Sequence, residues 1–189
     1  MPALTDYFAA LGAPAELARL DWAPRFRRHA VAAGEAVLTA GQPCDAYYVL
    51  AVGTLAFTRE VAGAEVTSWV VAEAQLFTDL AAFRQNRPAG LTVRALTDAV
   101  VHELPRADVE ALDATSLAWN QATRRVWEDA FLGTSDALAA FQGGDAALRY
   151  RELLEETDLL RHAPLRTLAS HIGVTPSSLS RLRRERRDG

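Results

Sequence analysis

The chain has 189 residues, half of them hydrophobic, and a formal net charge of −4. This length allows one large domain or two small ones, and no apolar run approaches the ~18 to 20 residues that span a bilayer. The N-terminus lacks the basic start and cleavage pattern of a signal peptide, and the single cysteine, Cys44, has no second cysteine to pair with. We therefore expect a cytoplasmic protein with no membrane partner.

After two short amphipathic helices expected within residues 3–20, the pattern from Arg25 to Leu104 is that of short strands. Apolar stretches are separated by glycine-containing turns roughly every ten residues. The expected strands lie within residues 25–31, 36–40, 47–52, 54–61, 65–73, 91–96 and 99–104. Such spacing favours an all-β sandwich or barrel.

Helical periodicity begins at Pro105. A short helix marked by Val109 and Leu112 precedes a long one from about Ser116 to Gln142, whose apolar residues recur every three or four positions. This stripe fits packing on the β domain and pairing with a second copy of the chain equally well. The residues expected at a dimer interface are Trp119, Thr123, Val126, Ala130 and Ala137. Another helix is expected over 145–162, after the hinge candidate Gly143-Gly144.

The segment from Pro164 to Arg187 has the spacing of two short helices that meet at Gly173. Glycine accepts a left-handed turn conformation, Thr175 can cap the second helix, and Pro176 suits its first position. The apolar residues that would face inward are Leu165, Leu168, Ala169, Ile172, Val174, Leu179 and Leu182. Together these features predict a helix-turn-helix.

The second helix of this motif has one polar face. At about 100° per residue, Ser180, Arg181 and Arg184 lie within about 60° of Ser177, and the leucines lie on the opposite side. Arg binds guanine O6 and N7 bidentately, Ser bonds bases or phosphates, and further guanidinium groups attract phosphates. We predict that helix 176–185 enters the major groove of double-stranded DNA. The expected DNA contacts are Thr175, Ser177, Ser178, Ser180, Arg181, Arg184, Arg186 and Arg187.

The distribution of charge agrees with this prediction. Residues 1–144 carry a net charge of −6, whereas residues 145–189 carry +2. A net positive charge that is confined to one part of the chain is typical of a DNA-binding module. The alternative is a solvated arginine-rich tail at the end of an ordinary helical hairpin.

No catalytic constellation is present. The four histidines are scattered without metal-ligand spacing on one helix, and neither a nucleophile elbow, a phosphate loop nor a dinucleotide fingerprint occurs. We expect no enzyme activity, no metal site and no cofactor.

A β sandwich, a long helix and a C-terminal helix-turn-helix together resemble the Crp/Fnr transcription regulators. The resemblance is most specific in Val31 to Gly53 and in Leu91 to Leu104, which look like the opening and closing strands of a cyclic-nucleotide-binding-type jelly roll. Arg149-Tyr150 and Thr167 to Arg183 look like the DNA-binding end of the family. The resemblance implies an α+β fold with a jelly-roll sensor over 1–107, connecting and dimerisation helices over 108–144, and a helix-turn-helix domain over 145–189. It also implies a homodimer that contacts RNA polymerase.

The chain departs from the cyclic-AMP-binding members of the family at the pocket. Their Gly-Glu-Leu turn, whose Glu holds the ribose, reads Thr78-Asp79-Leu80 here, and their phosphate-binding Arg-Ser pair reads Ala89-Gly90. Losing the guanidinium removes the bidentate grip on a phosphate. These five residues are the candidate effector pocket, but we do not expect cyclic AMP to bind in the family's manner.

We therefore predict a dimeric DNA-binding transcription regulator of the Crp/Fnr type. One alternative is a sensor module that binds a cyclic nucleotide or another small molecule in the β pocket. The other is a protein-interaction adaptor, an alternative favoured by the absence of the family's wing hairpin from the sequence up to Gly189.

Overall fold

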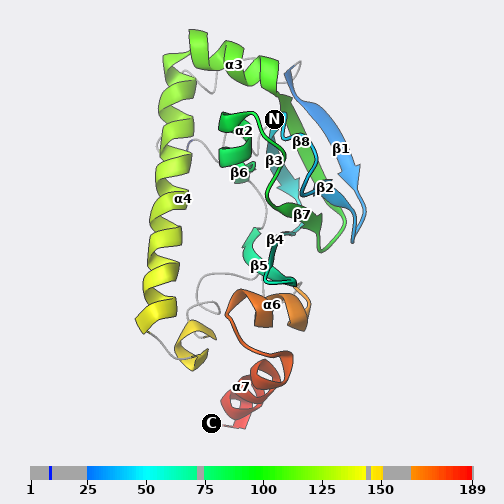
Figure 1. Ribbon diagram of the computed structural model, residues 1–189, viewed down its shortest axis with the longest axis vertical. Helices are drawn as coiled ribbons and strands as arrows, with labels where there is room; N and C mark the ends of the chain where they lie inside the picture. The colour runs from blue at the N-terminus through cyan, green and yellow to red at the C-terminus, as the bar shows by residue number, and fades with distance from the viewer. Residues whose placement is uncertain (1–8, 10–24, 72–74, 144–145, 151–162, 189) are drawn as a thin grey trace.

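The structure is a computed structural model that describes residues 9, 25–71, 75–143, 146–150 and 163–188. Two four-stranded antiparallel sheets form its centre (Figure 1). The first sheet has the order β1 (Arg27–Val31), β8 (Ala99–Pro105), β3 (Ala46–Val52), β6 (Gln75–Phe77). The second has the order β2 (Ala36–Leu38), β7 (Thr92–Ala95), β4 (Leu55–Val61), β5 (Ala64–Val71). The predicted jelly-roll-like β sandwich is confirmed, and strand β6 is an addition that sequence did not predict.

The strand β3 lies at the centre of the core because both of its faces are covered. Val49 and Leu50 point to opposite faces, and neither side chain is exposed. Tyr47 shares a face with Val49, and its ring packs against Phe83, Trp119 and Trp127. Helices therefore cover one face of β3, and the second sheet covers the other.

Three helices follow β6 and β8: α2 (Leu80–Gln85), α3 (Arg106–Thr115) and α4 (Leu117–Gly143). Helix α2 was not predicted, whereas α4 matches the predicted long helix within one residue at each end. The guanidinium of Arg106, the first residue of α3, links α2 to the segment just before β3. It donates to the carbonyl oxygens of Phe83 and Cys44 at 2.9 Å each and lies 4.0 Å from the centre of the Phe83 ring.

The first half of helix α4 buries one of its faces, whereas the second half is largely exposed. Trp119, Thr123 and Val126 are packed against the β sandwich of their own chain. The indole Nε1 of Trp119 also donates to Asp113 Oδ1 at 2.9 Å. These three residues, predicted at a dimer interface, are buried against the β domain of their own chain.

Beyond Val126, α4 runs along one side of the molecule to the C-terminal end (Figure 1). Ala130 and Ala137, the other two residues predicted at a dimer interface, are exposed. So are large apolar side chains of this half of the helix: Phe131, Leu132, Leu138 and Phe141.

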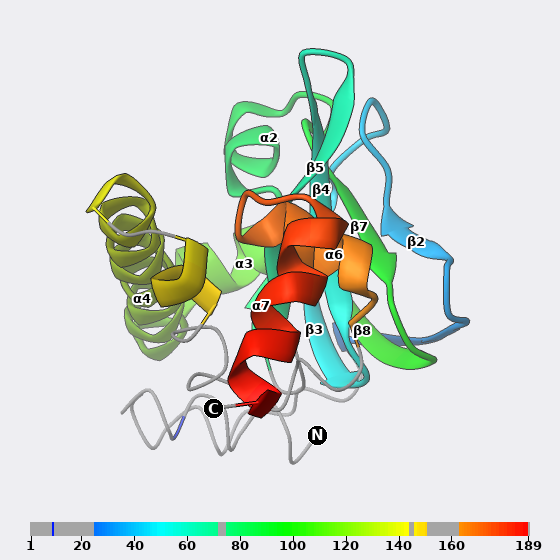
Figure 2. The same cartoon turned by 90° about the horizontal axis from the view of Figure 1, so that it is seen from below.

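The C-terminal residues form α6 (Leu165–His171), a turn over 172–175 and α7 (Pro176–Asp188). We call this unit the helical pair. Figure 2 shows α7 lying across α6 at the end of the molecule. The predicted helices at 3–20 and 145–162 lie outside the described residues, apart from Ala9 and a helical stretch over 146–150.

Candidate functional site

The turn of the helical pair has the local geometry that the sequence predicts. Gly173 has φ +70°, in the left-handed region that glycine tolerates. Thr175 caps α7, because its Oγ1 accepts a hydrogen bond from the backbone N–H of Ser178 at 3.2 Å. Pro176 is the first residue of α7. The backbone therefore reverses between α6 and α7 at the predicted positions.

The helical pair has its own small apolar core. Its buried members are Tyr150, Ala163, Leu168, Ala169, Ile172 and Leu179. Leu165, Val174 and Leu182 pack around them, as predicted, and so does Leu96 from the turn between β7 and β8. A residue of the β domain thus completes the core of the helical pair.

The predicted DNA-contacting residues gather on the opposite side of α7 from Leu179. Thr175, Ser177, Arg181 and Arg184 are exposed, and Ser178 and Ser180 are partly exposed. The hydroxyl of Thr175 also lies 2.9 Å from both Ser177 Oγ and Ser178 Oγ. Arg186 and Arg187 belong to α7, but their side chains lie outside what the structure describes.

Helix α6 is docked on strand β5 of the β domain. Ser170 Oγ accepts a hydrogen bond from the backbone N–H of Thr67 at 2.9 Å. The ring of His171 meets Trp69 edge-on at 6.3 Å between centroids, and Arg166 Nη2 lies 3.8 Å from Glu65 Oε1. No local sequence pattern predicts His171 at this contact.

Burial at this contact lowers the pKa of His171 below its ordinary value of 6.5. In the part of the chain that the structure describes, its Nδ1 has no hydrogen-bond partner. A charged imidazole would lose solvation there without gaining a partner for that nitrogen. Burial therefore favours the neutral form of His171 at this contact.

The five predicted effector-pocket residues lie together, around the start of α2. Asp79 caps α2, with Oδ1 accepting from Ala82 N at 3.1 Å and Oδ2 accepting from Gly90 N at 2.8 Å. The hydroxyl of Thr78 donates to the carbonyl oxygen of Ala46 at 2.9 Å. Leu80 opens α2, and Ala89 is buried beside Gly90. Both carboxylate oxygens of Asp79 thus accept hydrogen bonds from backbone N–H groups, as is typical of a carboxylate that stabilises a turn or loop.

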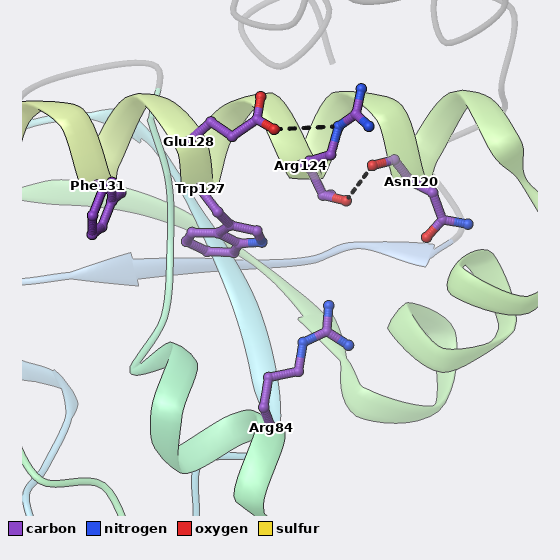
Figure 3. Close-up of a pocket in the computed structure, with 7 residues that line it drawn as sticks. Arg84, Asn120, Arg124, Trp127, Glu128 and Phe131 are labelled. Carbon is purple, nitrogen blue, oxygen red and sulfur yellow. Dashed lines mark hydrogen bonds and ion pairs between the residues drawn. The ribbon is translucent and has the colours of Figure 1, made fainter.

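Two hollows border the long helix and the helical pair, and sequence reasoning found neither. A shallow groove of about 400 Å³ lies between α2 and α4. In Figure 3, Arg84 points from α2 toward α4, while Trp127 and Phe131 project from α4 on the facing side. The second hollow, of about 390 Å³, lies between β4, β5, β7 and α6, where Arg94 and Arg166 line it. Both depend on the packing of distant segments, which leaves no local signal in the sequence.

Among the described residues there is no group of three or more His, Cys, Asp or Glu side chains that could hold a metal ion. The described helices also include none that is long and apolar enough to cross a membrane.

Comparison with known proteins agrees with the geometry. A family model described as "Cyclic nucleotide-binding domain" matches residues 28–116, the segment that holds both sheets, α2 and α3. Residues 28–116 are therefore similar to cyclic nucleotide-binding domains. No curated protein sequence matches the chain.

Solved structures show that the likeness continues past these residues. A Crp/Fnr-family regulator described as putative, from Eubacterium rectale, is 15% identical with a TM-score of 0.72 over 91% of this chain and 86% of that one. The c-di-GMP-responsive regulator CLP of Xanthomonas campestris is 14% identical with a TM-score of 0.71 over 87% and 88%. FixK2 of Bradyrhizobium japonicum is 15% identical with a TM-score of 0.70 over 85% and 83%. The resemblance to the Crp/Fnr family is thus confirmed in the fold of the chain.

Proposed function

We propose that the chain is a DNA-binding transcription regulator that acts as a homodimer, with the helical pair serving as its helix-turn-helix. The observation that carries this proposal is the division of α7 into two faces. Leu179 is fully buried, while Ser177, Arg181 and Arg184 are open to solvent. Hydroxyls and guanidinium groups on the outer face of a second helix are suited to base edges and phosphates in a major groove.

The homodimer is proposed on the exposed second half of α4. Phe131 is 72% exposed and Leu138 is 56% exposed. They are seven residues apart, so they lie on one side of the helix, with Ala130 and Ala137 beside them. Large apolar side chains in a row are unfavourable in water, and burying them against the same row of a second copy removes that cost.

The proposed mechanism follows from two-fold symmetry. Two copies of α7 would enter successive major grooves of a near-palindromic site, with half-sites about 34 Å apart. An effector or partner, RNA polymerase among the partners, would act by favouring one arrangement of the two helices over others. The engagement of Asp79 by backbone supports a response that does not use cyclic AMP.

The test is selection of binding sites from random DNA duplexes by the purified full chain, followed by sequencing, at near-physiological salt. We expect enrichment of a two-fold-symmetric site. An enriched single half-site without symmetry would contradict the dimer, and enrichment only with an added cyclic nucleotide would restore the sensor alternative. No enrichment under any condition would contradict DNA binding and favour the adaptor.

A further inference from the structure

Two side chains from outside the helical pair hold its turn. Phe141, near the end of α4, lies so close to Gly173 that a Cβ atom on the glycine would be 2.6 Å from its ring. Arg149, in the helical stretch 146–150, donates from Nε to the carbonyl oxygen of Ile172 at 3.0 Å. Its guanidinium also lies 4.6 Å from the centre of the Phe141 ring. We call Phe141 and Arg149 the turn clamp.

Gly173 suits this position for two separate reasons. Its φ of +70° belongs to the region that side-chain-bearing residues rarely adopt. The ring of Phe141 also occupies the space where a side chain would begin. The close approach of α4 to the turn therefore depends on the absence of a Cβ, in addition to the conformational need that the sequence indicates.

We propose that the turn clamp sets the direction in which α7 points, so that Phe141 and Arg149 are positioning residues for two-site DNA binding. This inference rests on the proposed function. Neither residue is on the exposed face of α7, and neither was among the residues predicted to bind DNA. They contact Ile172 and Gly173, which lie three and two residues before Thr175, the cap of α7.

The turn clamp joins the helical pair to the helix proposed for dimerisation. Phe141 lies on the same continuous helix, α4, as Phe131 and Leu138, the residues proposed at the dimer interface. A shift of α4 at that interface would therefore also move Phe141 and the turn that it contacts. On the other side, the bond from Thr67 N to Ser170 Oγ holds α6 to β5. With contacts on two sides, the helical pair is held in one orientation relative to the rest of the chain.

A purely stabilising role for the turn clamp makes a different prediction. In that case, loss of Phe141 would weaken the helical pair itself, and binding to a single half-site would fall along with binding to a full site. A positioning role affects mainly the full site, because only there must two recognition helices meet the DNA at a fixed separation. The two roles can therefore be distinguished.

The first experiment measures orientation without DNA. Spin labels are placed at R59C on β4 and R184C on α7, both exposed positions, in a C44S background. The distance distribution within one chain is read after dilution with unlabelled protein. We expect a narrow distribution in the native chain and in F141Y, which keeps the ring. We expect a broad one in F141A and R149A. The same narrow distribution in F141A and R149A would overturn the proposal.

The second experiment measures affinity for the selected full site and for its isolated half-site. We expect F141A and R149A to lose about tenfold or more on the full site, with half-site affinity within about twofold of native. R124A is the matched control, because it also removes an arginine, in this case from an exposed position on α4. It should bind the full site and the half-site with native affinity. Equal losses on both sites, or no loss, would overturn the turn clamp. If the native chain selects no DNA, the proposed function is contradicted. The spin-label distances alone then show whether Phe141 and Arg149 hold α7 in one direction.

Discussion

Oδ2 of Asp79 accepts a hydrogen bond from the backbone N–H of Gly90 at 2.8 Å, across the loop that follows α2. Its Oδ1 caps the same helix through Ala82 N at 3.1 Å. One carboxylate thus closes the segment 79–90 on itself. This is the segment in which cyclic-AMP-binding members of the Crp/Fnr family carry their ribose- and phosphate-binding residues.

Replacing Asp79 with alanine should lower the free energy of unfolding by about 1–2 kcal/mol, because the start of α2 loses its cap. D79N should lose less, since its amide oxygen can still cap α2. Chemical denaturation followed by circular dichroism gives the values. D129A, at an exposed position on α4, is the control and should stay within about 0.5 kcal/mol of native. Equal stability of D79A and D129A would contradict the role assigned to Asp79.

Cyclic AMP and cyclic GMP should give no heat of binding at micromolar concentration. Asp79 is occupied by two backbone amides, and Ala89 and Gly90 supply no guanidinium to a phosphate. Isothermal titration calorimetry on the full chain measures this. A saturable heat would show that another residue supplies the phosphate contact and that the pocket is a nucleotide sensor.

Arg181 and Arg186 should affect DNA binding in different ways. R181A should cost about 1–3 kcal/mol and relax the base preference at one position, as expected for a side chain that reads a base edge. R186A should weaken binding to all sequences alike and reduce the slope of log affinity against log salt by about one. Competition binding over a series of salt concentrations distinguishes them. Unchanged affinity of R181A for its operator would show that α7 is not the reading helix.

A charge at Phe131 should dissociate the proposed dimer. F131E places a carboxylate in the apolar row of α4, where burial against a second copy would leave it unpaired. A139E is the matched control, because Ala139 is exposed but lies about 80° around the helix from Phe131. Light scattering with size-exclusion chromatography should give the mass of one chain for F131E and of two for A139E. A dimer in both variants would place the seam elsewhere.

The contact between α6 and β5 should weaken as the solution becomes acidic. Because burial lowers the folded-state pKa of His171, the unfolded state takes up a proton first as the pH falls below about 6.5. The contribution of His171 is therefore complete above that pH and is lost as pH falls through the folded-state pKa. The difference in unfolding free energy between native and H171Q measures it, since other groups cancel. A difference that does not change between pH 8 and pH 5 would contradict a neutral buried imidazole.

The features that the sequence predicts well are those that neighbouring residues determine. Gly173, Thr175 and Pro176 specify the turn by their own backbone and capping preferences, and the structure has that turn. The alternation and glycine spacing of residues 25–104 likewise predict strands that the sheets contain. Helix α2 is only six residues long, too short for periodicity to reveal.

The features that sequence missed depend on which surfaces meet. Periodicity finds the apolar stripe of α4 but does not say what covers it, and Trp119 and Val126 proved to face their own β domain. The bond between Thr67 and Ser170 joins residues 103 positions apart. The sequence around Thr67 and Ser170 contains no pattern that predicts this hydrogen bond. The role of Phe141 at Gly173 was hidden for the same reason.

Leu96 has a consequence for how such a protein can be assembled from parts. It sits in a turn of the β domain, yet it packs in the core of the helical pair. Cutting the chain between the β domain and the helical pair would remove Leu96 from the core of the helical pair. It would also leave the apolar side chain of Leu96 uncovered on the β domain. The two halves are therefore not interchangeable units. A recombinant that joins the β domain to a foreign C-terminal domain should fold well only where that domain covers the side chain of Leu96.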